Sequence, residues 1–375
     1  MRKGRLRSGT MWRLALLAGT AAIASPAGAA TISWNAGTGD WFAANNWTPA
    51  QVPGANDTAI VNNGGTAQAG AAVAVSTLAA GSTFVAGESV SGTAAFTGTL
   101  TLSGELIVGR AFSAPGATAV GTVTAGTLTT QAPQFPPSFA FWSIGVGSGG
   151  SGTGTVTAAS VDTSAQALGA LNVGVANQGG TGIGSLSLGS GTLAVDANVF
   201  VGHATGQNGA AAVGTLALGG SLSAQGTNRL LRIGNLSGGV ADTGATSALG
   251  SIAAHGIAGF RLVTIGRSAV SDGAAASVTA SGAATIGAGG IINTTDPGGF
   301  LGIGVAFGEG VNNTVIGPGA AVTGSAAVGG NISGYAVVDI GRVVNTGQAS
   351  GSLDLTTGTL TTETLRIGTV QGSNG

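Results

Sequence analysis

A Val-Gly or Ile-Gly pair recurs along the chain at spacings of 27 to 38 residues, and this repeat limits the possible folds more than any other feature. Since a regular repeat of this length is typical of solenoids and propellers, it takes precedence over local propensities. Nine copies are found: LIVG (106–109), WSIG (142–145), LNVG (171–174), VFVG (199–202), LRIG (231–234), VTIG (263–266), LGIG (301–304), VDIG (338–341) and LRIG (365–368).

Each copy has two apolar positions separated by one variable position. The residue before the glycine is always Val or Ile, and the residue three before it is Leu, Val or Trp. The position between them has no common character: Ile107, Ser143, Asn172, Phe200, Arg232, Thr264, Gly302, Asp339 and Arg366. An alternation with a period of two predicts a strand with one buried face and one face open to solvent.

Two further short strand patterns follow in many repeats. Examples are GTVT (154–157), GSLSL (184–188) and GTLAL (214–218) for the second strand, and GTLAV (191–195) for the third. Propeller blades usually need 40 residues or more, and several repeats here are shorter than 30. We therefore predict an all-β fold, a right-handed three-sided parallel β-helix of roughly ten coils.

The glycine content fits this fold. Glycine accounts for 72 of 375 residues, and the coil corners need the positive φ angles that glycine tolerates. Cysteine is absent, so disulfides and thiolate metal sites are excluded.

Residues 1–30 have the features of an export signal. A basic leader with Arg2 and Lys3 precedes an apolar run at 14–24 and the small-residue pattern Ala27-Gly28-Ala29. Without this segment the chain keeps 7 basic and 13 acidic residues, a net charge of −6. A chain so poor in cations is not expected to bind nucleic acid or anionic membranes.

Three tryptophans lie close together in residues 31–60, just before the coils. Because the first coil of a solenoid has an uncovered apolar end, we expect Trp34, Trp41 and Trp47 to form a structural cap. A carbohydrate-binding module with exposed indoles is the alternative.

The coils are expected to occupy residues 61–375, with a loop projecting at 131–141. This stretch holds three prolines, which cannot join a β-ladder. Its aromatic residues Phe135, Phe139 and Phe141 form a possible contact loop for a surface glycan or a protein.

Few residues suggest catalysis. His203 and His255 occupy different repeat positions and are expected to be surface residues, and the aspartates are scattered at about one per coil. Asp339 and Arg366 share the variable column one coil apart, which predicts a solvated ion pair. Thr-x-Thr pairs resemble ice-binding arrays, but alanines interrupt them. We expect no enzyme activity, no cofactor and no metal, with a polysaccharide-acting β-helix enzyme as the alternative.

The segment before the coils resembles the start of autotransporter-type passenger domains and related secreted β-helical proteins of Gram-negative bacteria. The matching residues are Trp34, Gly39, Trp41, Asn46, Trp47, Val52, Pro53, Asp57 and Ile60. The resemblance implies export to the cell surface or beyond, and a role as a surface adhesin or structural passenger. The chain contains no segment expected to form the outer-membrane translocation barrel.

Overall fold

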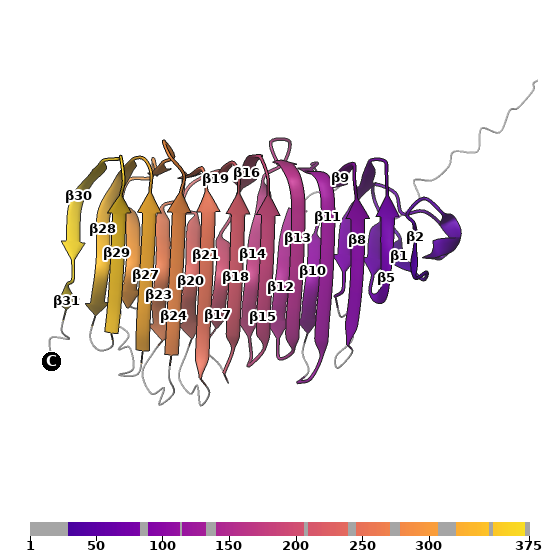
Figure 1. The fold of residues 1–375 in the computed structure, drawn as a ribbon, viewed down its shortest axis with the longest axis horizontal. Coiled ribbons are helices and arrows are strands. Elements are labelled where there is room, and N and C mark those ends of the chain that lie inside the picture. The colour runs from indigo at the N-terminus through magenta and orange to yellow at the C-terminus, as the bar shows by residue number, and fades with distance from the viewer. Residues whose placement is uncertain are drawn as a thin grey trace, which may run out of the picture.

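The computed structural model describes residues 29–82, 89–112, 115–132, 140–205, 209–238, 245–270, 278–306, 320–344 and 348–371. These residues form a parallel β-solenoid of about ten turns, a long rod along which the chain advances from one end to the other (Figure 1). The predicted all-β fold is confirmed. The expected signal segment falls almost entirely in residues 1–28, outside the described residues.

Three stacks of parallel strands run the length of the rod. The first, here the kinked sheet, contains the repeated apolar-Gly motif. Its strands are β1 (Thr31–Trp34), β4 (Thr58–Val61), β7 (Thr77–Ala80), β10 (Leu106–Phe112), β12 (Ala140–Ser148), β14 (Leu168–Asn177), β17 (Val199–Thr205), β20 (Leu230–Gly238), β23 (Leu262–Val270), β26 (Gly299–Ala306), β28 (Ile332–Val344), β30 (Leu360–Ile367) and β31 (Val370–Gln371).

The second stack, here the long sheet, contains the second strand of each repeat. Its strands are β2 (Thr38–Asp40), β5 (Asn63–Ala69), β8 (Val90–Phe96), β11 (Thr118–Thr130), β13 (Ser151–Asp162), β15 (Thr181–Leu188), β18 (Ala211–Leu218), β21 (Thr246–Ala254), β24 (Val278–Ile286), β27 (Ala320–Val328) and β29 (Gln348–Leu355). Its ladders align the glycines of successive GTVT-like motifs, as in the pairing of Gly154 with Gly184.

The third stack, the short sheet, completes each coil. It contains β6 (Val73–Val75), β9 (Thr99–Leu102), β16 (Gly191–Val195), β19 (Ser221–Ala224), β22 (Gly256–Ala258) and β25 (Ile292–Asn293), together with the ends of β11 and β13 and the starts of β28 and β30. In Figure 1 the near strands point upward while the chain advances to the left, which gives a right-handed coil.

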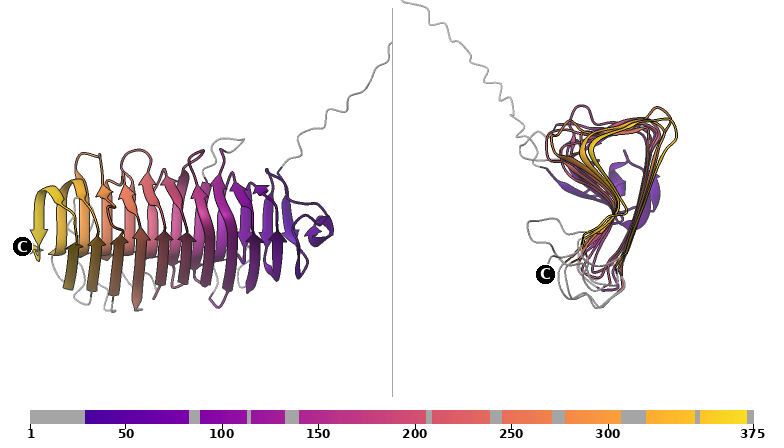
Figure 2. Two further views of the ribbon diagram at one scale, coloured as in Figure 1. Left: turned by 45° about the horizontal axis from the view of Figure 1, so that its top comes forward. Right: turned by 90° about the vertical axis from the view of Figure 1, so that its left-hand side faces the viewer.

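The glycine of the apolar-Gly motif has a positive φ in all nine copies, from 59° to 68°. In the seven copies from Gly109 to Gly304 it brings the kinked sheet against the long sheet. A Cβ atom on Gly145 would lie 1.8 Å from the carbonyl oxygen of Ile183, and one on Gly184 would lie 2.2 Å from the amide nitrogen of Gly174. The two backbones therefore touch, and the end-on view shows the chain narrowing to a waist (Figure 2).

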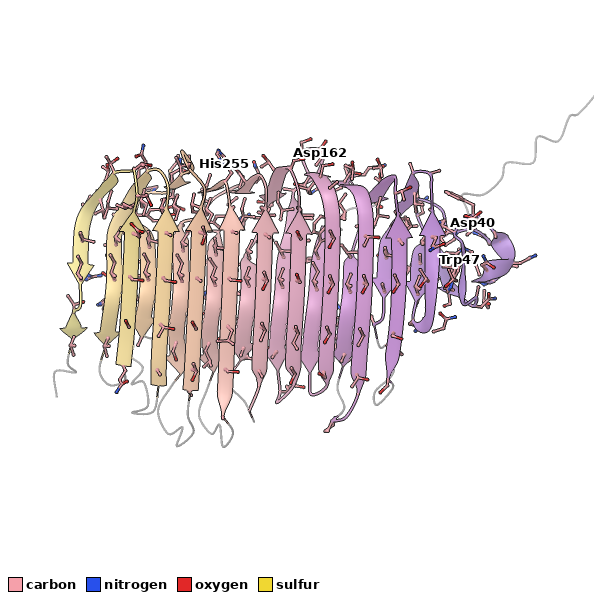
Figure 3. The ribbon with its side chains drawn as sticks, in the orientation of Figure 1. Asp40, Trp47, Asp162 and His255 are labelled. Atoms are coloured by element: carbon pink, nitrogen blue, oxygen red, sulfur yellow. The ribbon has the colours of Figure 1, made fainter. Side chains whose placement is uncertain are left out.

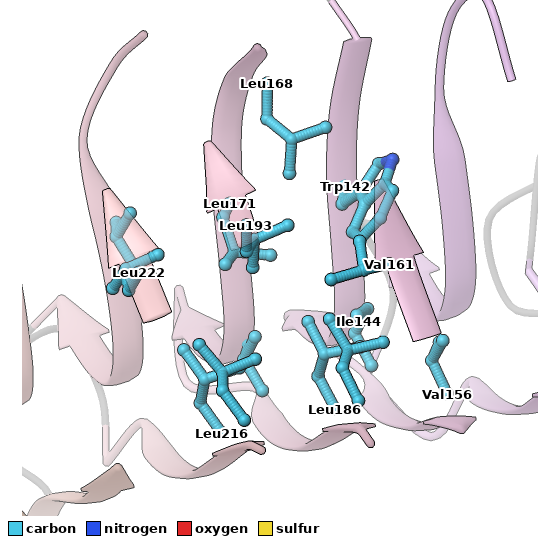
Figure 4. Packing of buried hydrophobic residues seen from close by; sticks show 14 of the residues in the cluster. Trp142, Ile144, Val156, Val161, Leu168, Leu171, Leu186, Leu193, Leu216 and Leu222 are labelled. Atoms are coloured by element: carbon cyan, nitrogen blue, oxygen red, sulfur yellow. The ribbon is translucent and has the colours of Figure 1, made fainter. Parts of the chain in front are cut away.

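The waist divides the core into two parts. The larger contains Leu, Ile, Val and Trp side chains from all three sheets, and Leu171, Leu186 and Leu193 of one coil meet inside it (Figure 4). The smaller is mostly alanine, including Ala176, Ala204 and Ala212. Positive φ was predicted for glycines at the coil corners, whereas the motif glycines have it inside the kinked sheet, where they form a contact between sheets.

The two ends of the rod differ in how the apolar interior is covered. At the first coil Ile32 and Ile60 are buried. In the last described coil the side chains of Leu365, Ile367 and Val370 are 46%, 66% and 75% exposed.

Candidate functional site

The three N-terminal tryptophans are buried. Their exposed fractions are 2% for Trp34, 0% for Trp41 and 1% for Trp47. Trp47 packs edge to face against both others, with ring centroids 4.9 Å from Trp34 and 4.6 Å from Trp41. Its indole nitrogen donates a hydrogen bond of 2.7 Å to the carbonyl oxygen of Trp41. The tryptophans thus form a packed cluster at the N-terminal end of the rod, where Figure 3 labels Trp47.

The segment that carries them is itself an incomplete coil. Strand β1 pairs in parallel with β4, and β2 pairs in parallel with β5, so the ladder of the solenoid already begins at Thr31. A short 3₁₀ helix, η1 (Ala44–Asn46), and β3 (Trp47–Thr48) then return the chain antiparallel to β1. Stacked sugar rings need exposed indole faces. The buried, edge-to-face arrangement of these three side chains does not offer such a platform.

The expected contact loop lies mostly outside the described residues. Phe135 and Phe139 fall in the undescribed stretch 133–139. Phe141 belongs to strand β12, where it is 38% exposed. The predicted loop bounds of 131–141 are therefore wrong at the C-terminal side, because Ala140 and Phe141 already join the ladder with β14.

Asp339 and Arg366 are paired in register, as the repeat alignment predicts. The expectation of a solvated pair is wrong, because the Asp339 side chain is 0% exposed. Arg366 binds both of its oxygens, with Nε–Oδ1 and Nη2–Oδ2 distances of 2.5 and 2.9 Å. Arg342 reaches the same carboxylate at 2.9 Å, since the kink at Gly341 turns it back toward Asp339.

The equivalent kink at Gly202 places His203 in a buried polar chain across three coils. Arg267 donates to the Asn235 side-chain oxygen at 3.0 Å, and the Asn235 amide lies 2.6 Å from His203 Nδ1. Ser237 lies 3.3 Å from the other ring nitrogen. Burial, reinforced by the charges of Arg232 and Arg267, lowers the pKa of His203 to about 3. His203 is therefore a neutral structural residue instead of the expected surface histidine, whereas His255 is exposed.

A cleft of about 790 Å³ opens where the short sheet meets the kinked sheet. Asp162, Gln166, Thr192, Asp196 and Gln225 contribute polar groups to it. Asp162 lies on the upper edge of the rod (Figure 3) and is hydrogen-bonded to Ser164, which lowers its pKa. Asp196 forms a 2.7 Å ion pair with Arg229. The cleft thus contains two carboxylates, and the pKa of Asp162 is lowered, opposite to the raised pKa of a general acid.

The outward face of the long sheet has a different composition. Seven neighbouring strands, β11, β13, β15, β18, β21, β24 and β27, each present four outward side chains, and the ladders align these in four columns. All of these residues are Thr, Ser, Ala, Val, Ile or Leu, and none is buried: Thr118, Val120, Thr122, Thr124, Ser151, Thr153, Thr155, Thr157, Thr181, Ile183, Ser185, Ser187, Ala211, Val213, Thr215, Ala217, Ser247, Leu249, Ser251, Ala253, Thr279, Ser281, Ala283, Thr285, Ala321, Thr323, Ser325 and Ala327. We call this surface the uncharged face.

An apolar stripe crosses the middle of the uncharged face. Ile183, Val213 and Leu249 lie next to one another on successive coils and are 42%, 37% and 41% exposed. Val120 stands in the same column two coils earlier, 48% exposed. Interrupted Thr-x-Thr pairs lie on this face, and the apolar column beside them was not predicted. The alternation within each strand could have revealed it.

Charged side chains gather elsewhere. Five of the seven arginines after residue 30, namely Arg110, Arg232, Arg267, Arg342 and Arg366, lie on the kinked sheet close to its glycines. Among the described residues, no group of three or more His, Cys, Asp or Glu side chains gathers to hold a metal ion. Within the same residues, no helix has the length and apolar character needed to cross a membrane.

Comparison with known proteins adds no family. Neither the protein-family models, nor the curated proteins, nor the solved structures include a match to this chain.

Proposed function

We propose that this protein is a non-enzymatic, exported β-solenoid of the bacterial surface, acting as an adhesin or structural passenger of autotransporter type. The observation that carries the proposal is the uncharged face. Soluble proteins usually interrupt a long exposed sheet with charges. Seven coils without a charged outward residue favour a surface that makes contact.

The dense internal hydrogen bonding supports a scaffold role. Asp339 is enclosed by two arginines, and His203 is held by Asn235 and Ser237. These side chains stabilise neighbouring coils, and they are not placed in an open cleft. The resemblance of the N-terminal segment to secreted Gram-negative passengers supports export.

Export can be tested with the complete chain and its own leader in a Gram-negative host. We expect the protein to be shaved from intact cells by an added protease, while a periplasmic marker stays intact. Protection of the chain in intact cells, with digestion only after lysis, contradicts surface exposure.

Contact through the uncharged face can be tested by cell adhesion. We expect the double variant Thr155→Arg/Thr215→Arg to abolish adhesion to a surface that the native protein binds, because both threonines are exposed on that face. Thr227→Arg, in an exposed turn at the opposite edge, is the matched control and should adhere normally. Equal adhesion of all three proteins contradicts a role for this face.

The cleft lined by Asp162 and Asp196 supports a second candidate function, action on a polysaccharide. Two carboxylates in one cleft are the minimum that glycoside hydrolysis requires. If this function is correct, Asp162→Asn and Asp196→Asn each abolish release of reducing ends from a polysaccharide panel, and exposed Asp354→Asn does not. No release by the native protein excludes hydrolysis of the polysaccharides tested.

A further inference from the structure

The uncharged face has the size of a protein interface. With neighbouring strands about 4.8 Å apart and outward residues about 6.6 Å apart along a strand, seven strands with four positions each cover about 900 Å². A stable complex of standard size buries about 800 Å² on each partner. Unlike an isolated apolar patch, this surface could by itself support a specific association.

The charge of the chain determines which partner the face suits. With the signal segment removed the net charge is −6, so two copies repel one another over most of their surfaces. This repulsion is weakest where neither copy carries a charge. Two uncharged faces can therefore meet without burying an unpaired ion, which would cost several kcal/mol.

The hydroxyl groups on the face are partly satisfied within their own sheet. Ser251 contacts Thr215 at 3.4 Å, and Thr323 contacts Ser281 at 2.9 Å, in each case between neighbouring coils. Hydroxyls that already have a partner lose less on leaving water. Most other outward side chains are short, as those of the near strands in Figure 3 illustrate, so two sheets can approach to about 10 Å.

From these observations we infer that two copies of this chain associate face to face through the uncharged face, with Val213 at the two-fold axis. Val213 lies at the centre of the seven strands, between Ile183 and Leu249. A two-fold axis through Val213, along the strand direction, places Ile183 of each copy opposite Leu249 of its partner. The apolar stripe then matches itself, as an isologous interface requires. This inference rests on the proposed function and names the partner of that surface.

The test places a positive or a negative charge on residue 213, at the proposed two-fold axis. Sedimentation of the signal-free chain should show dimers that dissociate only on dilution to micromolar concentrations or lower, the range of affinities of interfaces of this size. Val213→Arg and Val213→Glu should each be monomeric, because each places two like charges opposite one another. An equimolar mixture of the two variants should dimerise again. Thr227→Arg should behave as the native protein, and circular dichroism of every variant should be unchanged.

Three results overturn the inference. A native chain that stays monomeric throughout, a dimer that survives Val213→Arg, or a mixture that does not recover the dimer each excludes pairing through Val213. A monomer that binds ice or insoluble polysaccharide through this face assigns the face to a solid instead. Failure here leaves the proposed function testable separately, since a monomer whose adhesion is lost in Thr155→Arg/Thr215→Arg is still an adhesin.

Discussion

A Cβ atom on Gly174 would lie 1.8 Å from the carbonyl oxygen of Val213, which belongs to the opposite sheet of the solenoid. Gly174 also has a φ of +65°, in the left-handed region. Replacement by alanine therefore introduces both backbone strain and an overlap with another backbone. The same contact recurs along the rod, with Gly109 against Thr153 and Gly202 against Leu249.

We predict that Gly174→Ala destabilises the chain by more than about 2 kcal/mol, because only about 1–2 kcal/mol comes from the φ angle and the overlap adds to it. Gly289→Ala is the control, since Gly289 has a φ of +71° with no atom within 4 Å of its added Cβ. Urea unfolding of both variants measures the difference. Equal losses of stability show that the contact between sheets contributes nothing.

Removal of one indole from the N-terminal tryptophan cluster should destabilise the first coils locally. Trp47→Ala removes a fully buried indole and is expected to cost about 3–5 kcal/mol. Amide exchange should accelerate in β1, β2 and β4 and stay slow in β24, because solenoid coils contact mainly their neighbours. Phe42→Ala, which removes a side chain that is 44% exposed, serves as the control. Uniform acceleration along the whole rod argues against a local cap.

Removal of the buried charge at Asp339 should destabilise the folded chain strongly, although the repeat pattern predicts an exposed residue at this position. Asp339→Asn leaves Arg342 and Arg366 without their shared carboxylate, and we expect a loss of about 3–5 kcal/mol. Asp354→Asn, at an exposed position of β29, should change stability little. Unfolding in denaturant at neutral pH compares the two. A small effect of Asp339→Asn means that the asparagine retains the hydrogen bonds.

Mild acid should destabilise the protein through His203. The unfolded imidazole titrates near its ordinary pKa of 6.5, whereas the folded one titrates at about 3. Between these values the unfolded state binds one more proton, so stability falls as pH falls, by up to about 1.4 kcal/mol per pH unit. We expect His203→Gln to lose this dependence between pH 6.5 and 5. His255→Gln should keep it, because His255 is exposed. Identical pH profiles for native protein and His203→Gln contradict the assignment.

The repeat pattern predicted the strands and their register well. The apolar positions around each glycine are buried as expected, with Leu171 and Val173 both at 0% exposure. A period of two identifies a buried face without knowledge of the partner sheet. Asp339 and Arg366 were aligned correctly for the same reason.

What the pattern did not contain is the bend within the kinked sheet. Alternation assigns Asp339 and Thr264 to an open face, yet both are 0% exposed. The residues after the glycine turn back over that face, which buries His203 and brings Arg342 to Asp339. Such contacts depend on the direction of the chain beyond a residue with positive φ, and no local propensity records this direction.

The two facing columns of glycine also bear on how such a rod can change its length over generations. From Gly109 to Gly304 each motif glycine meets backbone atoms of the long sheet in the next coil, so duplication or loss of one whole coil leaves this pattern of contacts in place. A change of one or two residues is tolerated only in the connections between sheets, where the spacings of 27 to 38 residues already differ. Selection can thus vary the reach of the molecule in whole-coil steps while its cross-section stays constant.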